Sequence, residues 1–460
     1  MARYYDVIII GAGPAGVFCA ISLKEKNQNT SIAIIEKDRP LKKLLLSGGG
    51  RCNLSNIKAN SKDCLKFYPR GSRFISHLFY QYDFKSFCNW LKINKIETKI
   101  EEEGKIFLKS NNSNELESAF LKKLSNYKID IINEVFTDFV LTKNDKKNFK
   151  IITRKEDENK IYYSNYLVIA PGSNREILRL IKSKGIDVLN FIPSLYGFRI
   201  KELENSNLAG VSLKNIQGFI EYSSNFENKF SQSEDLKNGN LNENDIENFY
   251  NKIDKNECNK IKLNQKKMKL LYGDLLFTHE GLSGPLILKL SSYNAIELFQ
   301  NNYKAFLHLD LFPDKNMEIL EKELSIIFHK GAKLIKNICY EINIPSSFWR
   351  FIINRLNISS NKISNQITGS QIKKITKELK DLIFRIDGKS ISKEEFVSAQ
   401  GIDLKDIDKE CKSKKITNLY FIGEILNIDG ITGGYNLQSC WTTAYVCANS
   451  IAKSFFQNQV

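Results

Sequence analysis

The sequence predicts an α/β protein in which a Rossmann-like domain with a parallel sheet is interrupted by a second, inserted domain. Three observations lead to this fold class. The chain has 460 residues, 42% hydrophobic and 26% charged, which suffices for two or three globular domains. A strand, a glycine-rich turn and a helix pattern follow one another near residue 10, and the same order returns near residue 430. Apolar runs fall well short of the ~18 residues of a membrane helix, so we expect no membrane span and a cytoplasmic protein.

Charge and cysteine content narrow the possible functions. The net charge is +16, from 68 Lys and Arg against 52 Asp and Glu. This positive charge has two interpretations. The protein binds a nucleic acid or another anionic partner, or the charge only reflects a composition rich in Lys, Asn and Ile. The basic residues are spread along the chain, which favours the second interpretation and argues against a nucleic-acid partner. The nine cysteines form no Cys-x-x-Cys pair, which argues against a disulfide framework and a metal site.

The first glycine-rich motif predicts dinucleotide binding. An apolar strand pattern at 4–10 precedes it, and a helix pattern at 17–24 follows. Its first glycine permits a tight turn, its second lets a pyrophosphate approach the backbone, and its third lets the helix pack on the sheet. A second strand, at 31–35, ends at an acidic residue that can accept hydrogen bonds from a ribose. The predicted contacts are Gly11, Gly13, Pro14, Ala15, Gly16, Glu36 and Lys37.

The middle of the chain gives a coarser pattern. Residues 72–125 have mainly helical periodicity, and residues 128–170 alternate like strands, with Val135 placed after one of them for a backbone contact to adenine. Strand-like alternation returns at 195–222, and residues 317–382 are rich in helix-forming residues. Residues 223–266 are dominated by Asn, Lys, Glu, Asp and Ser, which predicts a flexible surface insertion.

The C-terminal motif resembles the second flavin-binding motif of glutathione-reductase-like enzymes. Residues 417–424 form a strand pattern that ends at Gly423 and Glu424, where the resemblance implies a contact to the ribityl chain. A second glycine pair then opens the last helix, whose N–H groups would face the N1/O2 edge of a flavin. The residues of this helix start are Gly433, Gly434, Tyr435, Asn436 and Leu437.

A third glycine-rich segment lies between these motifs. Consecutive glycines let the backbone approach a ligand, and the Arg51 and Asn53 side chains can bind phosphates or flavin carbonyls. Cys52 is either a packed residue or a thiol near the flavin, and the lack of a resolving cysteine favours packing. The candidate cofactor contacts here are Lys43, Ser47, Gly48, Gly49, Gly50, Arg51, Cys52 and Asn53, together with Gly172 from a later turn.

Three segments together resemble the BaiN-like, or aminoacetone oxidase, family of bacterial FAD-dependent oxidoreductases. They are Lys43 to Asn53, Phe277 to Pro285, and Gly423 to Gln438. The resemblance implies FAD as the cofactor, NADH or NADPH as a transient donor, and hydride transfer involving a small organic substrate. It also implies an FAD-binding domain of residues 1–192 and 383–460. The inserted substrate domain, residues 193–382, would be part β-barrel-like and part helical.

Two differences from the family's sequence pattern, and one histidine, are relevant to catalysis. The family's glycine- and hydroxyl-rich segment after Gly172 is missing, and Asn427 replaces an Asp, which indicates an altered active-site shape. His279 is either a general acid or base, or part of a structural motif in which Ser283 caps a helix. The alternative to an enzyme is a flavin-binding module for RNA or another anionic partner. The sequence specifies no oligomeric state.

Overall fold

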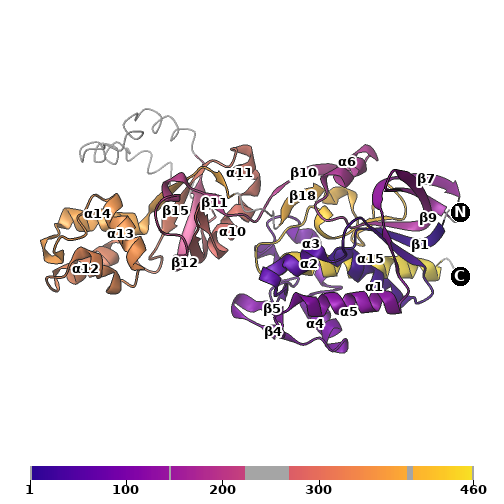
Figure 1. Ribbon diagram of the computed structural model, residues 1–460, viewed down its shortest axis with the longest axis horizontal. Helices are drawn as coiled ribbons and strands as arrows, with labels where there is room; N and C mark the ends of the chain where they lie inside the picture. The colour runs from indigo at the N-terminus through magenta and orange to yellow at the C-terminus, as the bar shows by residue number, and fades with distance from the viewer. Residues whose placement is uncertain (1–2, 145–146, 223–268, 391–396, 458–460) are drawn as a thin grey trace. The chain divides into compact units, whose positions relative to one another are not determined.

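The computed structural model describes residues 3–144, 147–222, 269–390 and 397–457, so the predicted insertion at 223–266 lies outside the described residues. The chain forms two compact units (Figure 1). The first unit comprises residues 1–195 and 395–460, and the second comprises residues 196–394. The first unit is therefore assembled from two segments that are distant in sequence.

The first unit contains a seven-stranded sheet with the strand order β6-β2-β1-β9-β8-β7, and β19 pairs with β9. Its strands β1, β2, β6, β9 and β19 are parallel, and β7 and β8 extend the sheet in antiparallel fashion. The strand bounds are β1 (Arg3–Ile10), β2 (Ile32–Glu36), β6 (Asp130–Asn133), β7 (Val135–Asn144), β8 (Lys147–Lys155), β9 (Glu158–Ile169) and β19 (Leu419–Phe421). This topology confirms the predicted α/β class.

Helices enclose the parallel strands. Residues 7–10 of β1 are all buried, because a strand covered on both faces is apolar at every position. The Phe18 ring of α1 contacts Trp441 of α15 at 5.6 Å between centroids, and Phe87 of α4 stacks on Trp441 at 4.6 Å. The helix bounds are α1 (Pro14–Lys26), α2 (Lys42–Leu46), α3 (Ser72–Phe79), α4 (Phe84–Ile93), α5 (Ser113–Asn126), α6 (Arg175–Ser183) and α15 (Tyr435–Gln457).

Two smaller sheets complete the first unit. One has the order β3-β5-β4, and the other consists of the antiparallel pair β10 and β18. Their bounds are β3 (Asn53–Asn56), β4 (Thr98–Ile100), β5 (Lys105–Leu108), β10 (Val188–Pro193) and β18 (Ser398–Ile402). We call the β10–β18 pair the connector ladder, because both strands lie next to the points where the chain passes between the units (Figure 1).

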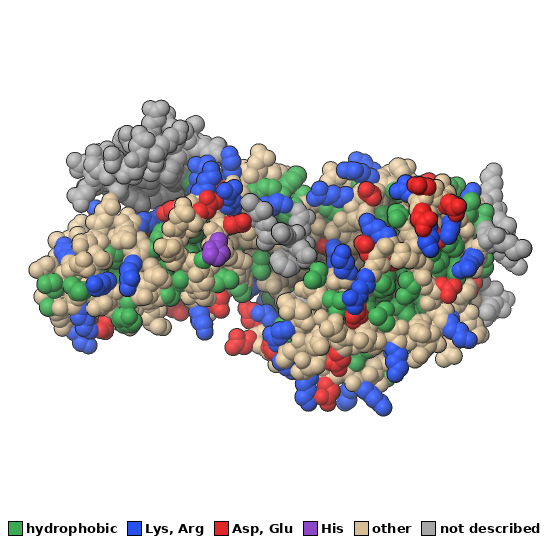
Figure 2. Space-filling model, viewed as in Figure 1, with side chains coloured by type: hydrophobic (Ala, Val, Ile, Leu, Met, Phe, Trp, Pro, Cys, Tyr) green, Lys and Arg blue, Asp and Glu red, His purple; other side chains and the backbone are tan. Residues whose placement is uncertain are grey.

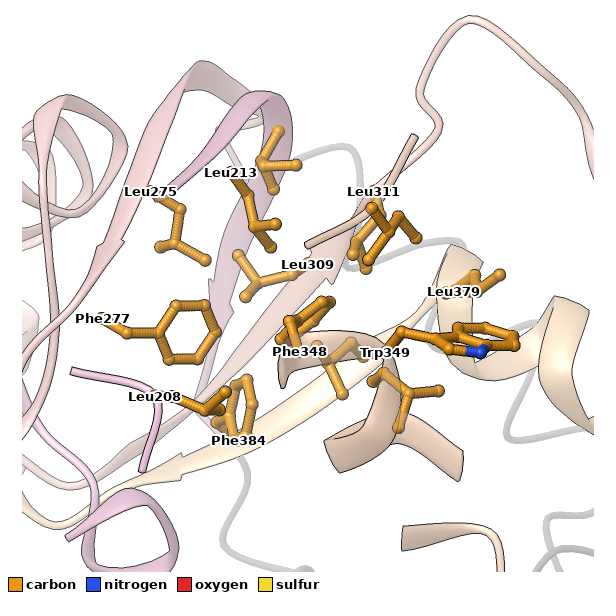
Figure 3. Packing of buried hydrophobic residues seen from close by; sticks show 14 of the residues in the cluster. Leu208, Leu213, Leu275, Phe277, Leu309, Leu311, Phe348, Trp349, Leu379 and Phe384 are labelled. Carbon is orange, nitrogen blue, oxygen red and sulfur yellow. The ribbon is translucent and has the colours of Figure 1, made fainter. Parts of the chain in front are cut away.

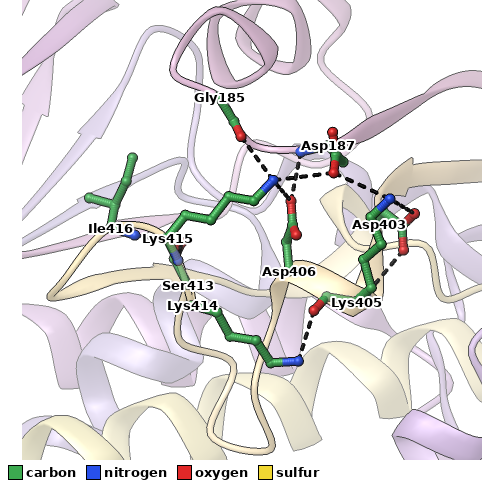
Figure 4. A network of polar contacts seen from close by, with 9 residues as sticks. All are labelled: Gly185, Asp187, Asp403, Lys405, Asp406, Ser413, Lys414, Lys415 and Ile416. Carbon is green, nitrogen blue, oxygen red and sulfur yellow. Dashed lines mark hydrogen bonds and ion pairs between the residues drawn. The ribbon is translucent and has the colours of Figure 1, made fainter.

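Lysine and aspartate side chains form ion pairs at the end of the connector ladder where β10 begins and β18 ends (Figure 4). The Lys415 ammonium lies 2.7 Å from Asp406 Oδ2 and 3.2 Å from Asp187 Oδ2. Asp406 also accepts a hydrogen bond from the backbone N–H of Asp187, at 2.8 Å. The hydrogen bonds of Lys415 and Lys405 lower the pKa of Asp187, so this carboxylate stays charged near neutral pH.

The second unit pairs a largely antiparallel sheet with a helical region. Its seven strands have the order β16-β15-β12-β13-β14-β11-β17. The strand bounds are β11 (Phe198–Arg199), β12 (Ser212–Glu221), β13 (Leu271–Phe277), β14 (Gly281–Ser283), β15 (Ala305–Asp310), β16 (Leu382–Ile386) and β17 (Gly388–Lys389). The helix bounds are α10 (Pro285–Tyr293), α11 (Ala295–Gln300), α12 (Met317–His329), α13 (Ser346–Arg355) and α14 (Gly369–Lys380).

The sheet and helices of the second unit share one hydrophobic core (Figure 3). Phe277 of β13 contacts Phe348 of α13 with 5.3 Å between ring centroids. Trp349 is fully buried, and its indole N–H donates to the carbonyl of Ile335 at 2.8 Å, which satisfies the polar atom of this side chain. The aromatic residues of the helical region therefore anchor it to the sheet.

His308 forms a buried charged cluster in this unit. Its ring lies between Asp381 Oδ1, at 2.8 Å from Nδ1, and Glu221 Oε2, at 3.0 Å from Nε2. It also stacks on Phe219 of the neighbouring strand, with 4.5 Å between centroids. Burial opposes protonation of the ring, but the two carboxylates outweigh burial and raise the pKa of His308 to about 9. The imidazolium therefore links β12, β15 and the end of α14 at neutral pH.

We expect the free energy of unfolding to fall between about pH 6.5 and 9 because of His308. The folded-state pKa lies above the unfolded value, so the stabilisation is present below about pH 6.5 and is lost as the pH rises through about 9. Denaturant unfolding should show a loss on the order of 2 kcal/mol across this range. His308→Gln should be less stable at pH 6 and should largely lack this pH dependence. An unchanged pH profile in His308→Gln would contradict the assignment.

Candidate functional site

The three glycines of the first motif have different surroundings. A Cβ at Gly11 would lie 2.4 Å from the carbonyl oxygen of Ala170, and Gly11 has φ +103°. A Cβ at Gly16 would lie 2.0 Å from the Gly11 carbonyl oxygen. A Cβ at Gly13 would meet no atom within 4 Å, although Gly13 is the N-cap of α1. Gly11 and Gly16 are therefore required by the protein itself, whereas Gly13 leaves the helix N-terminus open to a ligand.

Glu36 lies beside this turn, at the carboxyl end of β2. Its Oε2 accepts from the Ala12 N–H at 2.8 Å and its Oε1 from the Asp38 N–H at 3.0 Å. Each carboxylate oxygen has two lone pairs, so both can accept a further bond from a ribose diol. Lys37 is exposed next to Glu36, and Val135 begins β7. A cleft of about 380 Å³ starts at the same loop; it is lined by Asp38, Arg39, Lys42, Leu45 and Leu46.

The structure brings together three predicted residues from distant segments. Lys43 Nζ of α2 lies 3.3 Å from Glu424 Oε2 and 3.3 Å from the Ser173 hydroxyl. A Cβ at Gly172 would lie 3.5 Å from Glu424 Oε2 and 3.7 Å from Lys43 Nζ. Glu424 is also fixed through Oε1, which accepts from the Ser398 N–H at 3.0 Å. This group joins the ends of β9 and β19 to α2, and most of the Lys43 side chain is exposed (62%).

The first and last motifs are in direct contact. Gly423 has φ +72°, and a Cβ there would lie 2.8 Å from the Cβ of Ala15 in the first turn of α1. Its N–H donates to Thr443 Oγ1 of α15 at 3.0 Å. The N-terminal glycine turn and the C-terminal motif therefore meet at one edge of the parallel sheet, as a shared cofactor site requires.

The third glycine-rich segment meets the start of α15 through β3. The Asn53 amide, oriented with its nitrogen 3.1 Å from the Ser55 carbonyl, accepts from the Gly434 N–H at 3.2 Å. Asn56 Nδ2 donates to the Gly433 carbonyl at 3.1 Å. A Cβ at Gly434 would lie 2.3 Å from the Ser55 carbonyl oxygen. The close approach of β3 therefore explains the glycine at position 434.

The residues after Gly434 are fixed by their neighbours. Tyr435 stacks on Phe67 with 5.0 Å between centroids, and its carbonyl accepts from the Tyr68 hydroxyl at 2.7 Å. The Asn436 side chain exchanges two 2.8 Å hydrogen bonds with the backbone of Gly430. Leu437 is half-buried. The positive end of the α15 dipole lies at this end of the site.

Several predicted residues have structural partners. The Arg51 guanidinium pairs with Glu101, donates to Asn111 Oδ1 at 2.8 Å and lies 4.3 Å from the Phe107 ring centre. Hydrogen bonds from Lys99 and Arg51 lower the pKa of Glu101, which is consistent with a structural ion pair. Cys52 is fully buried with φ +56°. These contacts favour packing and positioning for Arg51 and Cys52.

The glycines before Arg51 remain accessible to a ligand. Residues 47–50 form a short 3₁₀ turn that contains Ser47 and Gly48. Gly49 and Gly50 have φ +67° and +83°, and a Cβ at either would meet no atom within 4 Å. The backbone is therefore open to a ligand at Gly13, Gly49 and Gly50. At positions 11, 16, 423 and 434, in contrast, neighbouring protein atoms leave no room for a larger residue.

One buried ion pair of this region was not predicted from the sequence. Arg70 binds both carboxylate oxygens of Asp429, and Ser194 Oγ donates to Asp429 Oδ2 at 2.8 Å. Asp429 is fully buried. The only signal was its place inside the C-terminal motif, since Arg70 and Ser194 lie in segments that carry no motif. The pair holds the loop that leads to Gly433.

His279 lies in the second unit, at the turn between β13 and β14, and its side chain is exposed. The predicted cap is wrong: α10 begins at Pro285 with Gly284 as its N-cap and no side-chain cap bond, and Ser283 belongs to β14. A role of His279 in acid–base catalysis stays a prediction. Among the described residues, no three His, Cys, Asp or Glu side chains are placed to hold a metal ion. Within the same residues, no helix has both the length and the apolar character needed to cross a membrane.

Comparison with known proteins gives the family. The profile of the HI0933-like protein Rossmann domain matches residues 5–450. A "Ribosomal RNA dihydrouridine synthase" of Haemophilus influenzae is 25% identical and covers 98% of this chain and 100% of the relative. The protein of the same name from Escherichia coli is 23% identical, with coverages of 97% and 98%. A "3-dehydro-bile acid delta(4,6)-reductase" of Clostridium scindens is 21% identical, with coverages of 97% and 98%.

The family match and the geometry agree. The profile spans both segments of the first unit, and the open backbone at Gly13 leaves room for a dinucleotide at the α1 N-terminus. The chain belongs to the HI0933-like family of Rossmann-fold flavoproteins and is an FAD-dependent oxidoreductase.

Proposed function

We propose that this protein uses NADH or NADPH to reduce a carbon–carbon double bond conjugated to a carbonyl group. Support comes from the contact between the Gly11–Gly16 turn and the Gly423–Glu424 motif beside an open helix N-terminus. When bound, FAD supplies hydride transfer through N5 of its ring. No second Gly-x-Gly-x-x-Gly motif is evident in the sequence, so we propose that the nicotinamide donor binds transiently.

We propose that different residues of the first unit bind different parts of FAD. The backbone at Gly13 and the α1 N-terminus would bind the diphosphate, and Glu36 would bind the adenosine ribose. Glu424, held by Lys43 and the Ser398 N–H, would orient the ribityl chain. The N–H groups at the start of α15 favour negative charge beside them, which suits the electron-accepting edge of the ring.

The names of the relatives support this type of reaction. A dihydrouridine synthase adds two hydrogens to the C5=C6 bond of uridine, which is conjugated to the C4 carbonyl. A delta(4,6)-reductase of a 3-dehydro bile acid reduces bonds conjugated to a ketone. Both reactions add a hydride to an electron-poor alkene carbon and a proton to its neighbour. We therefore propose the same class of substrate for this chain.

Uridine within RNA is a second candidate substrate. It is favoured by the two relatives named as ribosomal RNA enzymes. In Figure 2, Lys and Arg side chains are spread over the visible face of each unit, interspersed with Asp and Glu. This distribution identifies no single basic patch on that face, so a small conjugated ketone and RNA both remain candidate substrates.

An anaerobic reduction experiment tests the proposal. The purified protein should be yellow, and NADH or NADPH should bleach its visible flavin absorbance. Ribosomal RNA or a 3-keto-4-ene steroid is then added without oxygen. Return of the absorbance identifies the substrate class, and mass spectrometry should find dihydrouridine or the saturated ketone, respectively.

The outcomes separate the parts of the proposal. Bleaching without reoxidation by either compound, but with reoxidation by oxygen, would contradict the reductase proposal and leave the oxidoreductase class intact. A protein that takes up FAD but is bleached by neither nicotinamide would contradict the proposed donor.

A further inference from the structure

The connector ladder lies where the chain leaves and re-enters the first unit. The Ser194 N–H donates to the Val397 carbonyl at 2.9 Å, and Pro193 pairs with Ser398 in antiparallel register. Ser194 precedes the last residue of the first segment of this unit, Leu195. The end of the ladder nearest both crossing points is therefore defined by these few residues.

This end is bonded to the C-terminal motif on both strands. Directly after β10, Ser194 Oγ donates to Asp429 Oδ2 at 2.8 Å, and Asp429 is held by Arg70. On β18, the Ser398 N–H donates to Glu424 Oε1 at 3.0 Å. Two carboxylates of one motif, five residues apart in sequence, thus each hold one connector strand.

The last residues of β18 are joined to the same motif through the backbone. The Asn427 N–H donates to the Ile402 carbonyl at 3.1 Å, and Leu426 forms a parallel bridge with Ile402. Gly401, with φ +122°, allows the Ile425 carbonyl to approach, since a Cβ there would lie 2.3 Å away. The motif and β18 therefore have little freedom to move independently.

The opposite end of the ladder is fixed by the Lys415–Asp406–Asp187 network (Figure 4). The Asp403 N–H also donates to the Asp187 carbonyl at 2.9 Å. This end is anchored by side chains outside the motif, whereas the end nearest the crossing points depends on the bonds of Ser194 and Ser398 to the two motif carboxylates.

We propose that the connector ladder is a latch, held by Asp429 and Glu424, whose order is thermodynamically coupled to occupancy of the cofactor site. This inference rests on the proposed function. Glu424 Oε1 accepts the hydrogen bond from Ser398 of β18, whereas Glu424 Oε2 faces Lys43 and Gly172. A ligand that binds beside Lys43 and Gly172 therefore contacts the same carboxylate that holds β18. Coupling of this kind is reciprocal: the factor by which the bound cofactor stabilises the ordered ladder is also the factor by which the ordered ladder increases the affinity for the cofactor.

Ser194→Ala tests the latch, because it removes the bonds of the Ser194 hydroxyl to Asp429 and Arg70 and leaves the Arg70–Asp429 pair itself in place. Ser183→Ala is the matched control: it removes a hydroxyl that donates to a backbone carbonyl, at 2.7 Å, at the end of α6. FAD affinity and release from the holoenzyme are measured by flavin fluorescence. Amide hydrogen exchange of residues 188–194 and 397–402 is measured with and without FAD.

The expected result is that FAD slows exchange of both connector segments in the wild type and in Ser183→Ala. In Ser194→Ala this protection should shrink, and FAD should bind about fivefold more weakly. A wild type that binds FAD with no change in connector exchange would overturn the latch and leave the proposed function standing. Unchanged affinity and protection in Ser194→Ala would also overturn it. A wild type that binds no FAD would overturn the proposed function as well.

Discussion

Gly13→Ala should abolish most FAD binding while leaving the fold intact. Gly13 has φ −73° and ψ −179°, which alanine adopts readily, and its Cβ would meet no protein atom within 4 Å. The methyl group would instead occupy space that a diphosphate needs at the α1 N-terminus. Overpacking costs about 1–3 kcal/mol, so FAD affinity should fall roughly 5- to 150-fold. Loss of a helix cap should cost no more than about 1 kcal/mol of stability.

Gly16→Ala is the matched comparison, since its Cβ would lie 2.0 Å from the Gly11 carbonyl oxygen. This variant should lose at least about 3 kcal/mol of unfolding free energy, because backbone atoms on both sides must shift. Fluorescence titration with FAD and denaturant unfolding separate the two effects. If Gly13→Ala bound FAD as tightly as the wild type, the diphosphate could not lie against Gly13.

Asp429→Ala should destabilise the first unit by about 3–5 kcal/mol, measured by denaturant unfolding at fixed FAD concentration. The substitution leaves the Arg70 guanidinium, only 11% exposed, without its carboxylate partner, and Ser194 loses an acceptor. Removing one member of a buried pair costs more than removing both, because an uncompensated charge remains.

The double variant Arg70→Met/Asp429→Leu should therefore be more stable than Asp429→Ala alone. Glu97→Ala provides the control, since Glu97 and Lys109 form an exposed ion pair with side chains 72% and 66% accessible. It should change stability by less than about 1 kcal/mol. Equal losses in Asp429→Ala and Glu97→Ala would show that the buried pair contributes little.

Motifs whose residues contact neighbours close in sequence were predictable from the sequence. Gly16 is needed because its Cβ would meet the Gly11 carbonyl oxygen within the same βαβ unit, so the spacing of the two glycines indicated the turn, whereas the space at Gly11 is limited by Ala170, at the end of a distant strand. The start of α1 was less accurate: the apolar pattern begins at Val17, whereas the helix begins at Pro14. Proline is favoured in the first helical turn because it lacks only an N–H that has no partner there.

Residues whose partners lie far away in sequence were not predictable. Ser194 and Asp429 are separated by 235 positions, and no periodicity records such a contact. The ion pair of Arg51 with Glu101, which the β4–β5 hairpin brings within reach of its guanidinium, was likewise not predicted, and the contact of Arg51 to the cofactor stays a prediction. Ser283 was expected as a cap, but Gly284 takes that position with φ +95°, where a Cβ would lie 2.9 Å from the Asp274 carbonyl oxygen.

The late position of β19 and α15 in the chain sets the order of events during synthesis. The ribosome completes residues 196–394 before it makes β19, which pairs with β9, or Trp441, which packs on Phe18 and Phe87. The nascent first unit therefore exposes apolar surface while the second unit can already fold. Premature termination after the second unit would leave a fragment prone to aggregation, with one domain complete and the other unable to close.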